Sequence, residues 1–324
     1  MENHERFLLI QLVVPCFNEE ANIIPFFEEL DKADLAQAES DLRFEVIAVN
    51  DGSKDQTLKT LLEIQKERDD LTVIDLSRNF GKESALTAGL SEAGGDAVIP
   101  IDADGQHPFA TISEMVALWR QGYDVVLAKR NTRDTDTRLQ KWTARLFYKA
   151  HNQLSDINIP ADVGDFRLMD KKVVRVLNQL PENRRFMKGL FAWVGFRTAT
   201  VIYDVQPRSY GQTRFNTWKL WNLALEGITS FSISPLKIWT YVGVVVAFLS
   251  FLYASYLVAT TLIYGTDLPG YPSIMVAVLF MGGIQLISIG IIGEYLGRVY
   301  IESKNRPSYI IADIYKPESK TDSF

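Results

Sequence analysis

The chain carries the stretch Ala97-Val-Ile-Pro-Ile-Asp102-Ala-Asp104-Gly-Gln106, in which an apolar run ends in a pair of carboxylates. The apolar residues Ala97–Ile101 have the length and composition of a buried strand. Carboxylates two positions apart where a strand ends point to the same side. Magnesium and manganese ions bind through few carboxylates together with substrate phosphates, so a sparse acid pair suits them. The stretch therefore predicts a strand that leads into a metal–diphosphate site, with solvated acids at a turn as the alternative.

Strands and helices alternate on both sides of this stretch. Apolar runs predict strands, and segments with apolar residues at helical spacing lie between them. This alternation predicts an α/β domain with a mostly parallel sheet covered by helices on both faces. Ligands of such sheets bind at the carboxyl ends of the strands, where the acid pair lies. We interpret Pro15 as the end of the first strand and Asn18 as the cap of the helix that follows. The predicted strands are Phe7–Val14, Phe44–Val49, Leu71–Leu76, Ala97–Ile101 and Asp124–Ala128, and two further helices are predicted at Thr57–Arg68 and Lys82–Ala93.

Length and composition exclude several classes of protein. The 324 residues are enough for one large domain or two smaller ones. The net charge of −6 argues against general nucleic-acid binding, which favours a basic face. Cys16 is the only cysteine, which excludes an internal disulfide framework and fits a reducing compartment. The sequence has no zinc-type cluster of Cys and His, no Walker loop and no Gly-x-Gly-x-x-Gly motif.

The last third of the chain is apolar. Between Ile238 and Gly293 the only formally charged residue is Asp267. Two runs, Ile238–Tyr264 and Tyr271–Gly293, are each long enough to cross a hydrocarbon core of about 30 Å as a helix. The linker between them has no Lys or Arg, so the positive-inside rule places the α/β domain and both termini in the cytoplasm. We therefore predict an integral protein of the cytoplasmic membrane, with a buried helical hairpin of a soluble protein as the alternative. The basic residues that flank the runs on the other side are Lys237, Arg298, Lys304 and Arg306.

Two further segments adjoin the apolar runs. Residues 214–234 mix tryptophans with polar residues and predict an amphipathic helix at the membrane interface. Ser308–Tyr315 has the composition of a strand that pairs either with its own domain or with the sheet of a neighbouring subunit. The second alternative gives a homo-oligomer held through the tail and the membrane helices. The predicted division is a cytoplasmic domain at 1–213, the interfacial helix at 214–234, the transmembrane hairpin at 235–300 and a cytoplasmic tail at 301–324.

Four short motifs carry a resemblance to a known family. They are Val14-Pro-Cys-Phe-Asn-Glu-Glu20, Val49-Asn-Asp-Gly-Ser53, Arg78-Asn-Phe-Gly-Lys82 and Asp102-Ala-Asp-Gly-Gln-His-Pro108. In this order they resemble the family 2 inverting glycosyltransferases of the GT-A fold, and among these the polyprenyl-phosphate glycosyltransferases. That group includes dolichyl-phosphate-mannose synthase and bacterial bactoprenyl glucosyltransferases. Members with two C-terminal spans share the hairpin, so the resemblance covers nearly the whole chain. The Gln-x-x-Arg-Trp motif of processive polysaccharide synthases does not occur here, which favours transfer of a single sugar.

The resemblance implies roles for individual residues. The residues expected to bind the nucleotide are Pro15, Phe17, Asn18, Glu19, Asp51 and Asp102. The residues expected around Mg²⁺ or Mn²⁺ and the donor diphosphate are Asp102, Asp104 and Gln106. The residues expected to bind the acceptor phosphate or the diphosphate are Arg130, Arg133, Arg138, Lys141, Arg208 and Arg214. Asp165 is expected beside the transferred sugar, where Asp165 and Asp104 are the expected catalytic residues.

Structural alternatives to these roles stay open. Pro15 to Asn18 also suits a simple turn between a strand and a helix, and Asp51 lies in a natural turn. Asp165 also suits a helix cap or a salt bridge to Arg167. In the segment 208–215 a threonine and an arginine stand where the family has serine and lysine. Because arginine and lysine are not interchangeable, the geometry of that phosphate contact stays open.

The expected reaction is the inverting, metal-dependent transfer of glucose from UDP-glucose to undecaprenyl phosphate. Transfer of mannose from GDP-mannose or of a UDP-linked amino sugar is an alternative within the same class of enzyme. An alternative of another class is a non-catalytic membrane protein that binds nucleotide sugars. The acid pair together with several cationic positions favours the enzyme, because a sensor has no need to hold an acceptor phosphate.

Overall fold

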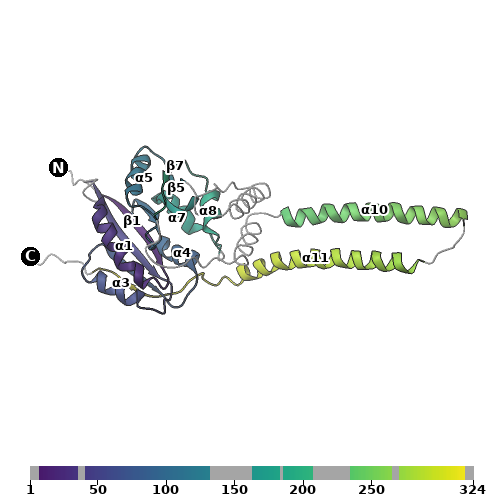
Figure 1. Ribbon diagram of the computed structural model, residues 1–324, viewed down its shortest axis with the longest axis horizontal. Helices are drawn as coiled ribbons and strands as arrows, with labels where there is room; N and C mark the ends of the chain where they lie inside the picture. The colour runs from purple at the N-terminus through teal and green to yellow at the C-terminus, as the bar shows by residue number, and fades with distance from the viewer. Residues whose placement is uncertain are drawn as a thin grey trace, which may run out of the picture.

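The computed structural model describes residues 7–35, 41–131, 163–182, 185–206, 234–264 and 270–317. Within them, eight strands form one sheet with helices on both faces (Figure 1). The strands are β1 (Leu8–Cys16), β2 (Leu42–Asn50), β3 (Leu71–Leu76), β4 (Ala97–Pro100), β5 (Val125–Arg130), β6 (Val163–Asp170), β7 (Thr198–Tyr203) and β8 (Ile311–Tyr315). The helices are α1 (Glu20–Ala33), α3 (Thr57–Gln65), α4 (Lys82–Glu92), α5 (Ala110–Arg120), α7 (Lys171–Gln179), α8 (Met187–Trp193), α10 (Ser234–Tyr264) and α11 (Tyr271–Ser303).

The sheet is mostly parallel, which confirms the predicted fold class. The strand order is β7-β5-β6-β4-β1-β2-β3-β8. β1 pairs in parallel with β2 and β4, β2 pairs in parallel with β3, and β5 pairs in parallel with β7. β6 runs antiparallel to β4 and β5, and β8 runs antiparallel to β3. The carboxyl ends of β1, β2, β3 and β4 therefore meet at one edge of the sheet.

β1 continues through Pro15 to Cys16, so the predicted end of the first strand before Pro15 is wrong. A proline in a central strand lacks the amide hydrogen that a neighbouring strand needs. The carbonyl of Val13 accepts a hydrogen bond from the β4 side, and that of Cys16 accepts one from the β2 side. This alternation turns the nitrogen of Pro15 toward β4, which has already ended at Pro100. The missing hydrogen therefore leaves no carbonyl of β4 without its partner.

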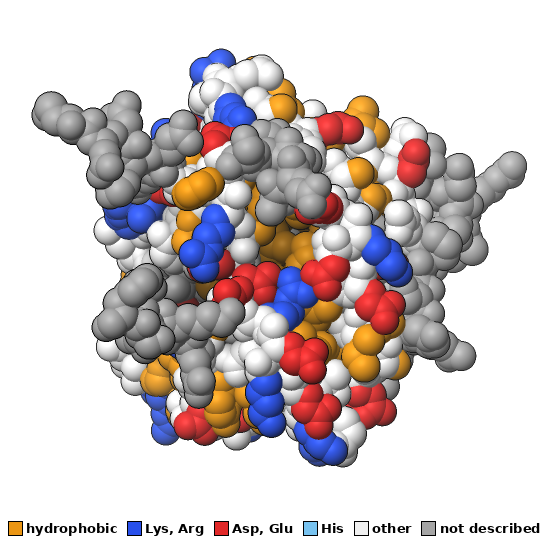
Figure 2. All heavy atoms as spheres, turned by 90° about the vertical axis from the view of Figure 1, so that its left-hand side faces the viewer, with side chains coloured by type: hydrophobic (Ala, Val, Ile, Leu, Met, Phe, Trp, Pro, Cys, Tyr) orange, Lys and Arg blue, Asp and Glu red, His pale blue; other side chains and the backbone are white. Residues whose placement is uncertain are grey.

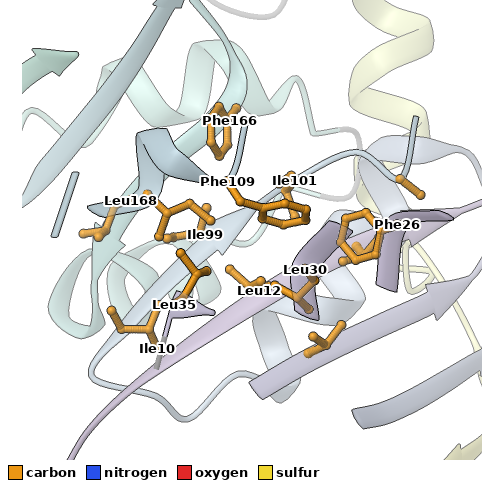
Figure 3. Packing of buried hydrophobic residues seen from close by; sticks show 14 of the residues in the cluster. Ile10, Leu12, Phe26, Leu30, Leu35, Ile99, Ile101, Phe109, Phe166 and Leu168 are labelled. Carbon is orange, nitrogen blue, oxygen red and sulfur yellow. The ribbon is translucent and has the colours of Figure 1, made fainter. Parts of the chain in front are cut away.

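Side chains of β1 alternate between two hydrophobic cores. Ile10 and Leu12 point into the core under α1, α3 and α5, which also contains Phe26 and Phe109 (Figure 3). Val13 points to the opposite face of the sheet, which α4, α7 and α8 cover. Burial on both faces explains why the sequence of this strand is an almost continuous apolar run. The site at the carboxyl end of β1 is thus built on the most buried part of the fold.

α10 and α11 lie side by side as a hairpin that projects from the α/β domain (Figure 1). By length and composition both helices can cross a membrane, within Tyr241–Thr260 and Val276–Ser303. No part of either apolar window is buried against the rest of the structure, so the described residues do not form the buried hairpin of a soluble protein. α11 continues to Ser303, beyond the predicted end of the second run at Gly293. The continuation brings the chain back to the α/β domain.

β8 lies at the edge of the sheet, after the return from the hairpin. The strand is shorter than predicted, since it begins at Ile311, and it pairs with β3 of its own chain. Of the two alternatives for this tail, the structure therefore shows pairing within the chain. The predicted interfacial helix at 214–234 lies outside the described residues, except for Ser234, which begins α10.

The two ends of the α/β domain differ. Figure 2 shows the face away from the hairpin, where acidic and basic side chains are interspersed and hydrophobic side chains are visible in a hollow between them. Helices α4 and α8 lie toward the other end, nearer to the hairpin (Figure 1). The hairpin therefore projects from the end of the domain toward which these two helices lie.

Candidate functional site

The four sequence motifs lie next to one another at the carboxyl ends of β1, β2, β3 and β4, and hydrogen bonds join them. The amide of Asn18 donates to Ser53 Oγ over 3.0 Å, and Asn18 Oδ1 accepts from the amide of Lys54 over 2.8 Å. Asn18 has a φ of 55°, in the left-handed region that asparagine tolerates. Its predicted role as a helix cap is wrong, because α1 begins at Glu20 without a side-chain cap. Asn18 instead links the first motif to the second.

Asp51 links the second motif to the third. Its Oδ1 accepts from the amide of Phe80 over 2.7 Å, and its Oδ2 accepts from the amide of Gly81 and from Asn79 Nδ2, both over 2.9 Å. Only 2% of Asp51 is exposed. Burial raises the pKa of its carboxyl group above the usual value, although the amides of Phe80 and Gly81 oppose the rise. Both oxygens thus hold the loop after β3, and contact of Asp51 with the nucleobase stays a prediction.

Gly52 lets these two loops approach each other. Its φ is 61°, and a Cβ at this position would lie 2.4 Å from the backbone carbon of Arg78 and from the backbone nitrogen of Asn79. Real Cβ atoms do not come so close to backbone atoms. A side chain at position 52 would therefore push the third motif away from the second.

Lys82 links the third motif to the fourth and is the first residue of α4. Its Nζ lies 2.7 Å from Asp102 Oδ1, 2.8 Å from Asp102 Oδ2 and 2.9 Å from Asp165 Oδ2. Burial alone would raise the pKa of Asp102, but Lys82 and His107 outweigh it and hold that pKa below its usual range. Sequence reasoning placed Lys82 within a motif but gave it no role. Its position between the end of β3 and the start of α4, at the ligand-binding edge of the sheet, could have indicated such a role.

Asp102 and Asp104 follow β4, as predicted. Asp104 Oδ1 accepts from the amide of Gln106 over 3.1 Å. The ring of His107 lies with Nδ1 3.1 Å from the hydroxyl of Tyr203 and Nε2 3.9 Å from Asp102 Oδ2. Among the described residues, no group of three or more His, Cys, Asp or Glu side chains forms a metal site. The oxygens of Asp102 and Asp104 are the kind of ligand that Mg²⁺ or Mn²⁺ takes together with phosphate and water.

Asp165 lies within β6 and faces Lys82. Its side chain is 15% exposed, and its Oδ1 is buried without a hydrogen-bond donor among the described residues. Neither structural alternative for Asp165 is observed: it lies inside a strand, and Arg167 donates to the carbonyl of Gly164 over 2.6 Å. Asp165 therefore has one oxygen on Lys82 and one that no described donor satisfies. Its catalytic role stays a prediction.

Glu83 is a further carboxylate of this cluster. Its Oε2 accepts from the amide of Met187 at the start of α8 over 3.2 Å. Burial and the charge of Asp165 raise the pKa of Glu83 to about 7. Sequence reasoning missed this residue because an acid in the first turn of a helix is ordinary and needs no partner.

The remaining predicted ligands of the nucleotide lie at the same edge. Phe17 is 38% exposed just after β1. The amide of Glu19 donates to Thr57 Oγ1 over 2.9 Å, which holds this turn against α3. Pro15 is the residue of β1 that pairs with Val49. These contacts place the residues together, and their binding of a nucleotide stays a prediction.

Of the predicted phosphate ligands, Arg130 lies within the described residues. It ends β5 and pairs with Tyr203 of β7. Burial raises the pKa of Tyr203, and Arg130 opposes the rise. Because Tyr203 also contacts His107, Arg130 lies on the acid-pair side of the sheet edge. The other predicted phosphate ligands lie outside the described residues: Arg133, Arg138, Lys141, Arg208 and Arg214.

Comparison with known proteins identifies a family, similar sequences and solved structures that align with part of the chain. Residues 11–177 match the family described as Glycosyl transferase family 2, and residues 234–299 match the GtrB C-terminal hairpin. The chain is 52% identical to an uncharacterised glycosyltransferase of Synechocystis over 308 residues, which cover 94% of this chain and 95% of the relative. It is 51% identical to a bactoprenol glucosyl transferase of Shigella phage SfV over 303 residues, which cover 93% of this chain and 97% of the relative. One solved structure that aligns with the chain is glucosyl-3-phosphoglycerate synthase from Mycobacterium tuberculosis, in complex with Mn²⁺, UDP-glucose and phosphoglyceric acid. The alignment covers 68% of this chain and 78% of that chain, with a TM-score of 0.45 and 18% sequence identity.

Proposed function

Because the chain belongs to glycosyl transferase family 2, we propose that it transfers one glucose from UDP-glucose to a polyprenyl phosphate such as undecaprenyl phosphate. The observation that carries this proposal is the 51% identity to a bactoprenol glucosyl transferase over nearly the full length of both chains. The geometry supports it, because the interlocked motifs bring Asp102 of the acid pair onto Lys82, which also contacts Asp165.

In this proposal Asp102, Asp104 and Gln106 hold Mg²⁺ or Mn²⁺ at the end of β4. When bound, the cation neutralises charge on the departing nucleoside diphosphate. The amide of Gln106 fixes Asp104 for this purpose. The nucleoside part of the donor binds at the neighbouring ends of β1 and β2, against the nucleotide-binding residues named above.

The acceptor phosphate attacks the anomeric carbon of the sugar. Its second pKa is about 6 by analogy with phosphorylated side chains, so it is mostly dianionic at pH 7 and does not depend on a strong base. It does need cations, and Arg130 supplies the guanidinium that suits a phosphate. Asp165 faces the sugar and stabilises positive charge that develops at the anomeric carbon, or takes up a proton. Attack on the side opposite the leaving diphosphate inverts the configuration of that carbon.

The hairpin of α10 and α11 anchors the enzyme in the cytoplasmic membrane. Helices of 31 and 33 residues are longer than a hydrocarbon core of about 30 Å needs at 1.5 Å per residue. The α/β domain and both termini lie in the cytoplasm in this proposal, on the side of the basic flanking residues. The acceptor then keeps its prenyl chain in the bilayer and presents its phosphate at the end of the domain where α4 and α8 lie.

The test is transfer of radiolabel from UDP-glucose and, separately, from GDP-mannose to undecaprenyl phosphate, with Mg²⁺ or with EDTA. We expect a lipid-extractable glucose product that EDTA abolishes. A product from GDP-mannose alone, or from a UDP-linked amino sugar alone, would change the donor and keep the reaction class. Binding of nucleotide sugars without any lipid product from these donors would instead support the non-catalytic alternative. The topology is tested separately, by labelling cysteines introduced into the linker 265–269 of a Cys16→Ser protein in sealed vesicles of known orientation.

A further inference from the structure

The ammonium group of Lys82 touches two carboxylates to which the proposed function gives different roles. Asp102 is a proposed ligand of the divalent cation, and Asp165 is the proposed residue beside the sugar. Nζ contacts both oxygens of Asp102 and one oxygen of Asp165, all within 2.9 Å. Within the described residues, Lys82 is the only cation in contact with Asp165. One side chain therefore connects both acids, while His107 also lies 3.9 Å from Asp102.

The loop before α4 fixes the position from which Lys82 reaches these acids. Asp51 accepts hydrogen bonds from the amides of Phe80 and Gly81, immediately before Lys82. Gly81 has a φ of 99°, which turns the chain into the helix. The side chain of Lys82 itself is 45% exposed. A fixed backbone with a long, half-exposed side chain lets the ammonium group move between nearby partners without movement of the loop.

Occupation of Asp102 by Lys82 conflicts with its proposed role as a metal ligand. Both oxygens of Asp102 lie within hydrogen-bond distance of Nζ, and the positive charges of the ammonium group and of a divalent cation repel each other, so the cation competes with the lysine for this carboxylate. Asp165 is different, because only its Oδ2 contacts Lys82 and its buried Oδ1 lacks a described donor. Lys82 can therefore leave Asp102 and still hold Asp165 through Oδ2, with Oδ1 turned to a ligand hydroxyl.

We propose that Lys82 is a positioning residue that occupies the metal-binding oxygens of Asp102 before the donor binds, yields them to the divalent cation, and keeps Asp165 in place throughout. This inference rests on the proposed function for the identity of the metal and of the sugar. The competition between Lys82 and a cation for Asp102 does not depend on which sugar is transferred. It is therefore measurable without turnover.

The test compares Lys82→Met with Lys82→Arg and with Lys59→Met, a charge-removing control on the exposed side of α3. Mn²⁺ affinity of the full-length protein in detergent is measured without nucleotide, by electron paramagnetic resonance of the free ion. We expect Lys82→Met to bind Mn²⁺ about fivefold more tightly than the unaltered protein, the equivalent of one exposed ion pair. Lys59→Met should match the unaltered protein.

Turnover is the second readout, because it reports on Asp165. We expect Lys82→Met to lower kcat about tenfold or more, since Asp165 loses the ion pair that fixes its position. The KM for UDP-glucose should stay within about threefold of the unaltered value. Lys82→Arg, which keeps the charge, should retain more turnover than Lys82→Met.

Unchanged or weaker Mn²⁺ binding by Lys82→Met would overturn the proposal, as would unchanged turnover. If Lys82→Met does not fold, Lys82→Gln is measured in its place by the same criteria. If even the unaltered protein transfers no glucose, the proposed function fails, and the Mn²⁺ comparison alone decides whether Lys82 competes for Asp102.

Discussion

Replacement of Gly52 by alanine tests whether the interlocked loops hold the site together. At a φ of 61°, an alanine costs about 1–2 kcal/mol relative to glycine. The new Cβ also meets backbone atoms of Arg78 and Asn79 at 2.4 Å, and backbone atoms cannot rotate away as the end of a side chain can. Overpacking of this kind costs about a further 1–3 kcal/mol. Gly52→Ala should therefore destabilise the domain by about 2–5 kcal/mol in total.

The assay is thermal unfolding of the full-length protein in detergent, followed by tryptophan fluorescence. For a domain of roughly 200 residues, the expected decrease in Tm is on the order of 10 °C. Gly195→Ala is the control for backbone strain, because its φ is 66° and the added Cβ meets only the carbonyl oxygen of Trp193, at an ordinary 3.7 Å. Gly94→Ala, which has neither strain nor a close neighbour, controls for the substitution itself. If Gly52→Ala lowers Tm no more than Gly195→Ala does, close contact between the two loops does not hold the site together.

Three further predictions concern the carboxylates of the site. Asp165→Asn should lower kcat about 100-fold or more, measured by single-turnover transfer, while its affinity for UDP-glucose, measured by titration, changes less than about threefold. Loss of donor binding would make Asp165 a structural residue. Asp102→Asn should abolish metal-dependent transfer and weaken Mn²⁺ binding by about tenfold or more in a titration, and retained transfer would refute the metal assignment. Burial and Asp165 raise the pKa of Glu83 from an ordinary 4.5 to about 7 in the folded protein. Between these pH values the folded state holds a proton that the unfolded state has lost, so the free energy of unfolding falls as the pH rises. Glu83→Gln should therefore raise Tm by about 2–4 °C at pH 8 and by less at pH 5, with Glu92→Gln at the exposed end of α4 as the control; an equal effect at both pH values would contradict the sign.

The central sheet was predictable because its strands are buried on both faces. Strands such as β2 and β3 are short apolar runs with helical segments between them, and this alternation is typical of a parallel sheet covered by helices. β6 was not predicted, because Val163–Asp170 mixes apolar residues with Asp165 and Arg167. The segment shows neither the two-residue period of a strand nor the 3.6-residue period of a helix. Its antiparallel direction depends on a long connection whose path the sequence does not indicate. Pro15 was misjudged for a similar reason, since its tolerance in β1 depends on where β4 ends.

The residues of the site were predictable by type and position, but their contacts were not. The acid pair and Asp51 fall at strand ends, and strand ends are where α/β sheets bind ligands. Asn18 satisfied the rule for a helix cap, yet a hydrogen bond to the amide of Lys54, distant in sequence, replaced that role. The contact of Lys82 with Asp102 and Asp165 likewise joins three segments, and no local pattern records it.

The hairpin and the loop that carries Lys82 are attached to the same strand. β3 ends at Leu76, and the Arg78–Lys82 motif follows at once. β8, which follows the hairpin, pairs with β3 up to this point, and the amide of Ser77 donates to the carbonyl of Ile310 over 2.9 Å. The return from α11 is therefore hydrogen-bonded to the start of the loop that positions Lys82. In the proposed function the acceptor stays in the bilayer, so the donor site has to be held near the membrane, and the pairing of β8 with β3 connects the hairpin to that site.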